Sequence, residues 1–216
     1  MTKGKIVVLS SIVLIMLFVL GSFLVKDKQR ETLGSLALQN AEALIREHSQ
    51  TMGNADAKVA IVEFMDPGCE TCRAFDPFIK QMLAAYPGKL KLVIRYAPLH
   101  HGADYMCAVL EAARKQGKYW ETLQVMYDTQ PTWADHHNPQ PQLIWQYLPR
   151  VGLDLKRLKK DMTDPAIARL IEQDMADART LRVTKTPGFF VNGKPLVTFG
   201  YDQLQALIEA ELRASY

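Results

Sequence analysis

The hydrophobic pattern divides the chain into an apolar N-terminal stretch and a longer part of mixed polarity. Residues 6–25 contain no charged side chain, and lysines lie on both sides of them. Twenty helical residues span about 30 Å, the thickness of the hydrocarbon core of a bilayer. The pattern therefore predicts a transmembrane helix, an uncleaved signal anchor, within residues 1–30. A removed signal peptide is the alternative.

Residues 31–54 connect this stretch to the rest of the chain. Leu36, Leu44 and other apolar residues favour a juxtamembrane helix or stalk, and Gly53-Asn54 breaks that pattern. Residues 55–216 are numerous enough for one domain with a sizeable core.

Two apolar runs with a helical pattern between them begin this domain. Val59–Met65 is rich in branched and aromatic residues and predicts a buried strand. Residues 89–96 alternate between polar and apolar side chains and predict a second strand. Between them, Phe75, Ile79 and Met82 recur at helical spacing, so an amphipathic helix is expected.

Helical patterns fill the next part of the chain, and strands return after it. The predicted helices cover residues 103–116, 119–128, 142–148, 154–162 and 165–179. Residues 189–191 and 195–199 then predict two strands joined by the Asn192-Gly193 turn. A final amphipathic helix contains Leu204 and Ile208. The order is strand, helix, strand, helical block, hairpin and helix.

Charge argues against nucleic-acid binding. The net charge is +3, from 26 basic and 23 acidic residues. Residues 1–30 contain five basic residues and one acidic residue, so the rest of the chain has a net charge of −1. The basic character therefore belongs to the apolar N-terminal stretch, and no basic binding face is expected.

Cys69 and Cys72 are the main candidates for chemistry. They lie between the first predicted strand and the first amphipathic helix, which places the Cys69 thiol at a helix N-terminus. There, unpaired amide hydrogens and the positive end of the helix dipole stabilise a thiolate. The thiolate is the nucleophile in disulfide exchange, so the pattern predicts a thiol–disulfide oxidoreductase.

Three segments resemble the DsbA-like branch of the thioredoxin superfamily. Residues 62–72 are similar to its strand and redox turn, residues 116–121 to a part of its helical domain, and residues 184–193 to its cis-proline loop and hairpin. The resemblance implies an α/β thioredoxin fold over residues 55–216. It also implies an inserted all-helical domain at about residues 100–181, with the transmembrane helix preceding the fold.

The resemblance also implies roles for individual residues. Cys69 would be the exposed attacking cysteine and Cys72 the buried resolving one, acting on cysteine-containing protein substrates without an organic cofactor or a metal. Thr186 and Pro187 would form the cis-proline loop opposite the pair. Glu63 would be a buried acid that relays protons to Cys72, or alternatively a carboxylate at a strand edge that faces solvent.

Glu70 and Thr71 replace the Pro-His pair of strong oxidants in the family. A carboxylate beside Cys69 is expected to raise the pKa of its thiol and to disfavour the thiolate. A strong oxidant has a stabilised reduced form, so we expect a weaker oxidant here, suited to isomerisation or reduction.

A cysteine pair that forms disulfides would be kept reduced in the cytosol. We therefore expect a single-pass protein of the cytoplasmic (inner) membrane with its catalytic domain in the periplasm. Its partner would be a membrane redox protein. A quinone-coupled oxidase would serve an oxidant, and a membrane electron carrier would serve an isomerase or reductase.

The alternative function is periplasmic binding of copper or zinc on a thioredoxin scaffold. Its ligands would be Cys69, Cys72, Cys107 and one of His100 or His101. The second half of this ligand set is irregular in spacing. The doublet at residues 136–137 is a poor chelator by itself, because adjacent side chains point in different directions. For Cys107 a buried, inert thiol is favoured over a third redox-active cysteine.

Overall fold

The computed structural model describes residues 3–135 and 139–216, without the side chains of residues 3 and 5–10. In chain order the elements are α1 (Lys3–Gln39), α2 (Ala41–Leu44), β1 (Gln50–Gly53), β2 (Val59–Met65), α3 (Glu70–Ala85), β3 (Leu90–Tyr96), α4 (Ala103–Arg114), α5 (Tyr119–Trp133), the 3-10 helices η1 (Pro141–Gln146) and η2 (Leu148–Val151), α6 (Leu155–Asp161), α7 (Pro165–Thr180), β4 (Gly188–Val191), β5 (Lys194–Pro195) and α8 (Tyr201–Ser215).

A mixed sheet with the order β1-β3-β2-β4-β5 forms the centre of the fold. β2 pairs in parallel with β3 and antiparallel with β4, whereas β1 pairs antiparallel with β3. All seven residues of β2 are buried, as its continuous apolar run predicts for a central strand. β1 is not apparent in the sequence pattern, because its residues lie at the end of the expected stalk and alternate between partly buried and exposed.

The two faces of the sheet serve two separate cores. Ile61 and Met65 of β2 pack in the larger core with α3, α8 and the helical block. Val62 and Phe64 point to the other face and pack with residues from α1, α2 and α7. Successive side chains of a strand alternate between faces, so β2 contributes to both cores.

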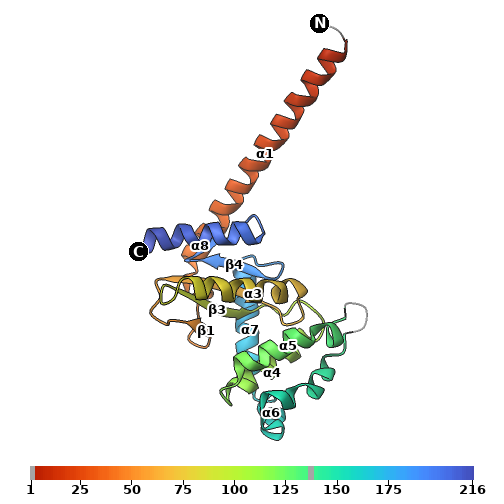
Figure 1. Cartoon of the computed structure of the whole chain (residues 1–216), viewed down its shortest axis with the longest axis vertical. Coiled ribbons are helices and arrows are strands. Elements are labelled where there is room, and N and C mark those ends of the chain that lie inside the picture. Colours follow the sequence, from red (N-terminus) through yellow and green to blue (C-terminus); the bar gives the residue numbers. More distant parts are fainter. Residues whose placement is uncertain (1–2, 136–138) are drawn as a thin grey trace.

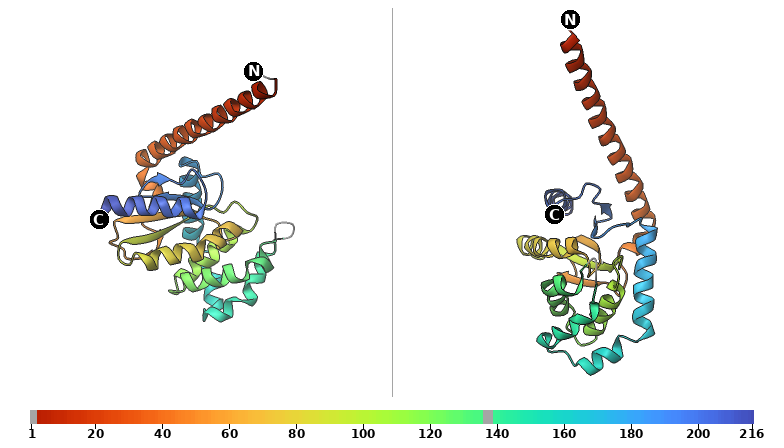
Figure 2. Two further views of the ribbon diagram at one scale, coloured as in Figure 1. Left: turned by 45° about the horizontal axis from the view of Figure 1, so that its top comes forward. Right: turned by 90° about the vertical axis from the view of Figure 1, so that its right-hand side faces the viewer.

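The helical block forms a lobe of its own below α3 (Figure 1). α4, α5 and α6 make up most of this lobe, and α7 then runs back along the sheet to reach β4 (Figure 2). This arrangement confirms the predicted thioredoxin fold with a helical insertion between β3 and β4.

α1 is a long rod that projects away from the rest of the molecule (Figure 1). It continues through the predicted boundary at residue 30 and exposes large apolar side chains between Ile12 and Val25. Among the residues that the structure describes, no helix has both the length and the apolar character needed to cross a membrane. The transmembrane segment predicted at residues 6–25 is therefore not confirmed.

Two local predictions are wrong in detail. The strand predicted at residues 195–199 ends at Pro195, and only one further backbone hydrogen bond, from the Leu196 N–H group to the carbonyl oxygen of Phe189 at 2.9 Å, continues the pairing with β4. The helix predicted at residues 142–148 is divided into η1 and η2. Pro149 has no N–H group to continue a helix, and short 3-10 turns tolerate that interruption.

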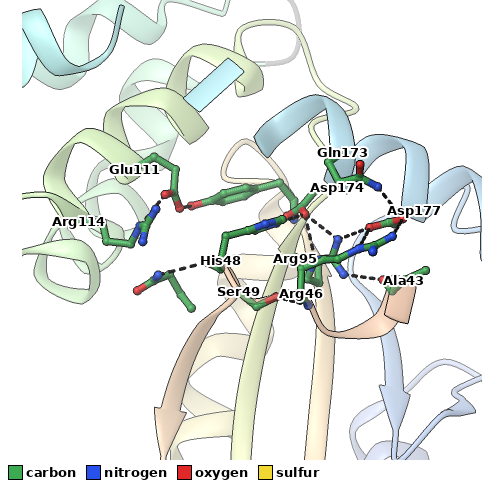
Figure 3. Close-up of polar contacts among 12 residues, drawn as sticks. Ala43, Arg46, His48, Ser49, Arg95, Glu111, Arg114, Gln173, Asp174 and Asp177 are labelled. Carbon is green, nitrogen blue, oxygen red and sulfur yellow. Dashed lines mark hydrogen bonds and ion pairs between the residues drawn. The ribbon is translucent and has the colours of Figure 1, made fainter. Parts of the chain in front are cut away.

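A buried charge network attaches the segment after α2 to the helix α7 (Figure 3). Arg95 of β3 is fully buried and donates hydrogen bonds to Asp174 and Asp177, both at 2.6 Å. From the N-terminal side, Arg46 binds Asp177 at 2.8 Å and His48 Nε2 lies 2.6 Å from Asp174. Burial alone would raise the pKa of Asp177, but its hydrogen bonds with Arg46 and Arg95 hold that pKa below its ordinary value.

Candidate redox site

The two cysteines lie at the junction of β2 and α3. Cys69 is the N-cap residue of α3 with extended backbone angles, and Cys72 lies in the first turn of the helix. Cys69 is 5% exposed and Cys72 is completely buried, and both are free thiols. A strand that ends in a tight turn before a helix brings the two residues together and leaves only Cys69 within reach of solvent.

The surroundings give the two thiols very different pKa values. The pKa of Cys69 is lowered to about 5, chiefly by a hydrogen bond from the Cys72 thiol, with further hydrogen bonds from Thr186 and from the backbone N–H groups of Cys72 and Thr71. Burial opposes this lowering but is outweighed. The pKa of Cys72 is raised well above its ordinary value, first by burial and then by its hydrogen bond with Cys69. At neutral pH the site therefore holds one thiolate and one thiol.

Glu63 lies in β2 and is 4% exposed, so it is a buried acid and not a solvent-facing carboxylate. Burial raises its pKa to about 8, and the nearby Asp76 and Cys69 add to this effect, whereas a hydrogen bond with Cys72 opposes it. None of the described residues makes a hydrogen bond with its Oε1 atom. Its ionised form, which is the minor form at pH 7 because of the raised pKa, can accept the proton that the Cys72 thiol must lose before it becomes a nucleophile.

Replacing Glu63 with glutamine is expected to stabilise the fold at neutral pH. The folded-state pKa of about 8 exceeds the unfolded value, so the folded protein binds the extra proton between about pH 4.5 and 8 and loses stability as pH rises through this window. Glutamine does not titrate, so the gain at pH 7 is up to about 3 kcal/mol. Urea unfolding of both proteins from pH 4 to 8 measures it, and parallel pH profiles would contradict the expectation.

The cis-proline loop faces the pair. The Thr186-Pro187 peptide bond is cis, which confirms that prediction. The Cys69 Sγ atom lies 3.3 Å from the carbonyl oxygen of Thr186. The sequence placed these residues 117 positions apart, and the pairing of β4 with β2 brings them into contact.

The expected effect of Glu70 on Cys69 is wrong. The pKa of Cys69 is low although Glu70 is the next residue, and the causes of the shift are hydrogen bonds to the sulfur. Glu70 is exposed, so water and salt screen its charge, whereas the hydrogen bonds act at contact distance. Thr71 acts through its backbone N–H group, a contribution that any residue except proline could make at this position.

Two buried polar residues support the redox turn and were not found by the sequence analysis. Asp66 is fully buried, and its carboxylate accepts hydrogen bonds from the backbone N–H groups of Gly68, Leu99 and His100 at 2.7, 2.7 and 2.8 Å. Gln130 of α5 donates from its side chain to two carbonyl oxygens of the turn. The position of Asp66 just after a strand was a weak signal, and no local pattern indicated Gln130.

The ligand set of the metal-binding alternative is not assembled. Within residues 3–135 and 139–216, no group of three or more His, Cys, Asp and Glu side chains is placed to hold a metal ion. His100 binds Asp66 through Nδ1 at 2.7 Å, and Cys107 is completely buried in α4, where burial raises the pKa of its thiol. The doublet at residues 136–137 lies outside the described residues.

Solved structures with this arrangement belong to the class of DsbA-like thioredoxin-fold oxidoreductases. A thioredoxin-like oxidoreductase from Silicibacter pomeroyi DSS-3 has a TM-score of 0.70 and 29% identity, over 82% of this chain and 99% of that chain. The thiol-disulfide exchange protein alpha-DsbA2 from Wolbachia pipientis has a TM-score of 0.71 over 85% and 97% of the two chains, and its 20% identity shows likeness of fold alone. The chain itself belongs to the thioredoxin family, whose sequence pattern matches residues 46–210.

Curated relatives fall into two groups. A probable disulfide bond formation protein D from Bacillus cereus is 29% identical over 173 residues, which are 76% of this chain and 79% of the relative. A Na(+)/H(+) antiporter NhaA from Herminiimonas arsenicoxydans is 29% identical over 165 residues, and NhaA 3 from Salinispora tropica is 34% identical over 145 residues. The matches cover 76% and 66% of this chain but only 25% and 21% of these two antiporters.

Proposed function

We propose that this chain exchanges disulfides with protein substrates through Cys69 and Cys72. The observation that carries the proposal is the position of Cys69 at the N-terminus of α3, with its sulfur 3.3 Å from the carbonyl oxygen of Thr186 in the cis-proline loop and with Cys72 buried in the first turn of the helix. These surroundings lower the pKa of Cys69 and raise that of Cys72. In such a pair, Cys69 can attack or leave as a thiolate, whereas Cys72 stays a protonated thiol until Cys69 has reacted.

As an oxidant, the chain would begin with a Cys69–Cys72 disulfide. A substrate thiolate attacks the sulfur of Cys69 and forms a mixed disulfide, while Cys72 leaves as a thiolate and takes up a proton. A second substrate thiolate then attacks the substrate sulfur of this mixed disulfide, and Cys69 leaves as a thiolate. The substrate loses two electrons and the chain gains them. The low pKa of Cys69 makes it a good leaving group in this last step.

As a reductant or isomerase, the same site would begin with both cysteines reduced. The Cys69 thiolate attacks a substrate disulfide and releases one substrate thiolate. Glu63 in its ionised form accepts the proton of Cys72, and the resulting thiolate attacks Cys69 to release the second substrate sulfur. The Thr186 carbonyl beside Cys69 offers a backbone acceptor for strand-like pairing with the substrate.

The stability of the Cys69 thiolate favours the oxidising direction. A reduced form that is stabilised by a thiolate raises the reduction potential of the pair. Related proteins have a pKa of about 7 with a potential near −270 mV, or a pKa of about 3.5 with a potential near −120 mV. With a pKa of about 5, the expected potential lies between these limits, at roughly −180 mV.

Equilibration of the purified protein with graded glutathione buffers tests the function and its direction together. We expect one reversible two-electron transition at roughly −180 mV, and a thiolate absorbance at 240 nm that titrates near pH 5. A potential near −270 mV would assign the protein to reduction. The absence of any reversible transition would refute the enzyme function.

The proposal also includes a cellular location and a redox partner. The glutathione of the cytosol would keep the pair reduced, so we place the catalytic domain in the periplasm. Apolar side chains exposed on α1 between Ile12 and Val25 support attachment to the inner membrane. A quinone-coupled oxidase in that membrane would restore the disulfide, whereas a membrane electron carrier would serve the reducing direction.

Labelling of Cys69 in intact cells by a membrane-impermeant thiol reagent tests the location. Labelling only after lysis would contradict it.

A further inference from the structure

Gln130 joins the inserted helical lobe to the redox turn. It lies near the end of α5 and is 1% exposed. Its Nε2 atom donates hydrogen bonds to the carbonyl oxygens of Pro67 and Cys69, at 2.8 and 3.1 Å. These residues precede Gln130 by 63 and 61 positions, so the contact exists only because the lobe folds back onto the turn.

The two bonds fix the backbone from which the Cys69 thiolate is stabilised. The carbonyl of Cys69 is also the first acceptor of α3, since it receives the N–H group of Arg73 at 3.2 Å. The backbone N–H groups of Thr71 and Cys72 in the same helical turn donate to the Cys69 sulfur. A side chain that holds the carbonyls of Pro67 and Cys69 therefore sets where these N–H groups stand relative to the sulfur.

The orientation of the amide group is fixed by chemistry. Two carbonyl oxygens can be satisfied only by the –NH₂ end of a glutamine, so the Oε1 end must point away from the turn. Oε1 is buried, and no hydrogen bond joins it to any residue in the described part of the chain. A buried unpaired acceptor destabilises the fold, so stability alone does not account for a glutamine here. The electropositive end of the side-chain amide meanwhile faces the segment that carries the thiolate.

We propose that Gln130 is a positioning residue for the redox reaction, which holds the turn in the form that favours the Cys69 thiolate. This role rests on the proposed exchange through Cys69 and Cys72. Through Gln130, the packing of the helical lobe determines how strongly the reduced pair is stabilised. The lobe thus contributes to the redox equilibrium of the pair through a direct contact with its turn.

Gln130→Met tests the proposal, because methionine keeps the length and bulk of the side chain and cannot donate. We expect the pKa of Cys69 to rise, and the glutathione equilibrium to shift by about fivefold toward the disulfide form, as for the loss of one net hydrogen bond. Gln124→Met is the matched control. It makes the same change on the same helix at a residue that binds Lys80 and Asp128.

Thermal unfolding separates positioning from stability. Removing the unpaired Oε1 offsets part of the loss of the two bonds, so the melting temperature of Gln130→Met should stay close to that of the control. Gln130→Leu is the second variant, since leucine is also a bulky side chain that cannot donate to the carbonyls. It should raise the thiol pKa as Gln130→Met does.

Wild-type values of thiol pKa and glutathione equilibrium in both folded Gln130 variants would overturn the proposal. So would a failure of both variants to fold, because that would give Gln130 a purely structural role. A failure of the proposed function is a different result, since the wild-type protein would then lack a reversible redox transition.

Discussion

Cys72→Ala is expected to trap this protein on its substrates. Cys69 keeps its position at the N-terminus of α3, where the backbone N–H groups of residues 71 and 72 still donate to its sulfur. It can therefore attack a substrate disulfide, but no second thiol remains to break the mixed disulfide. Catalytic turnover should fall by about 10³-fold or more, while covalent complexes accumulate.

Non-reducing electrophoresis of the variant, expressed in cells and alkylated at lysis, measures this trapping. Cys69→Ala should form no complexes, because Cys72 is completely buried and the pKa of its thiol is raised. Cys107→Ala is the matched control, since it removes a third buried cysteine in α4 and should leave turnover unchanged. Complexes that persist in Cys69→Ala would contradict the assignment of Cys69 as the attacking residue.

Trapping depends on features that the sequence predicts well. The pair at a strand-to-helix junction is a local pattern, and so are the apolar run of β2 and the helical spacing of α3. The order of the later elements follows in the same way from periodicity, so the helical lobe and the Asn192-Gly193 turn are found nearly where predicted. Local signals therefore suffice for most of the element order and for the position of Cys69, whereas the fold class was predicted from the resemblance of three segments to a known family.

The energetics of the site depend partly on contacts that no local pattern contains. The sequence predicts that Glu70 controls the thiol, because it is the neighbouring residue. The pKa of Cys69 depends instead mainly on a hydrogen bond from Cys72, three positions away, and in addition on Thr186, while Gln130 holds the turn. The contacts with Thr186 and Gln130 span 117 and 61 positions, and they arise only from the packing of the folded chain. β1 was missed for a similar reason, since its four residues are defined by pairing with β3.

Arg95→Met is expected to destabilise the fold more than any other single change outside the cysteine site. It removes a fully buried guanidinium group that binds Asp174, Asp177 and the carbonyl oxygen of Ala43 (Figure 3). Two buried carboxylates then lose their main counter-charge, which costs about 3–5 kcal/mol. For a protein of this size the melting temperature should fall by roughly 6–20 °C.

Graded controls distinguish burial from charge in this prediction. Arg46→Met removes a partly exposed partner of Asp177 and should have an intermediate effect. Arg157→Met breaks an exposed pair with Asp161 and should change stability by less than about 0.5 kcal/mol.

The dependence of stability on pH in acid gives a second test. The pKa of Asp177 is lowered in the folded protein, so the stabilisation that it provides is present above about pH 4 and is lost as the pH falls through the folded-state value. Arg95→Met lacks the part of that stabilisation that Arg95 provides, and it should show a shallower loss of stability in acid. Equal melting temperatures for the Arg95 and Arg157 variants would show that burial does not increase the contribution of an ion pair to stability. The buried network would then not be what holds the N-terminal segment against α7.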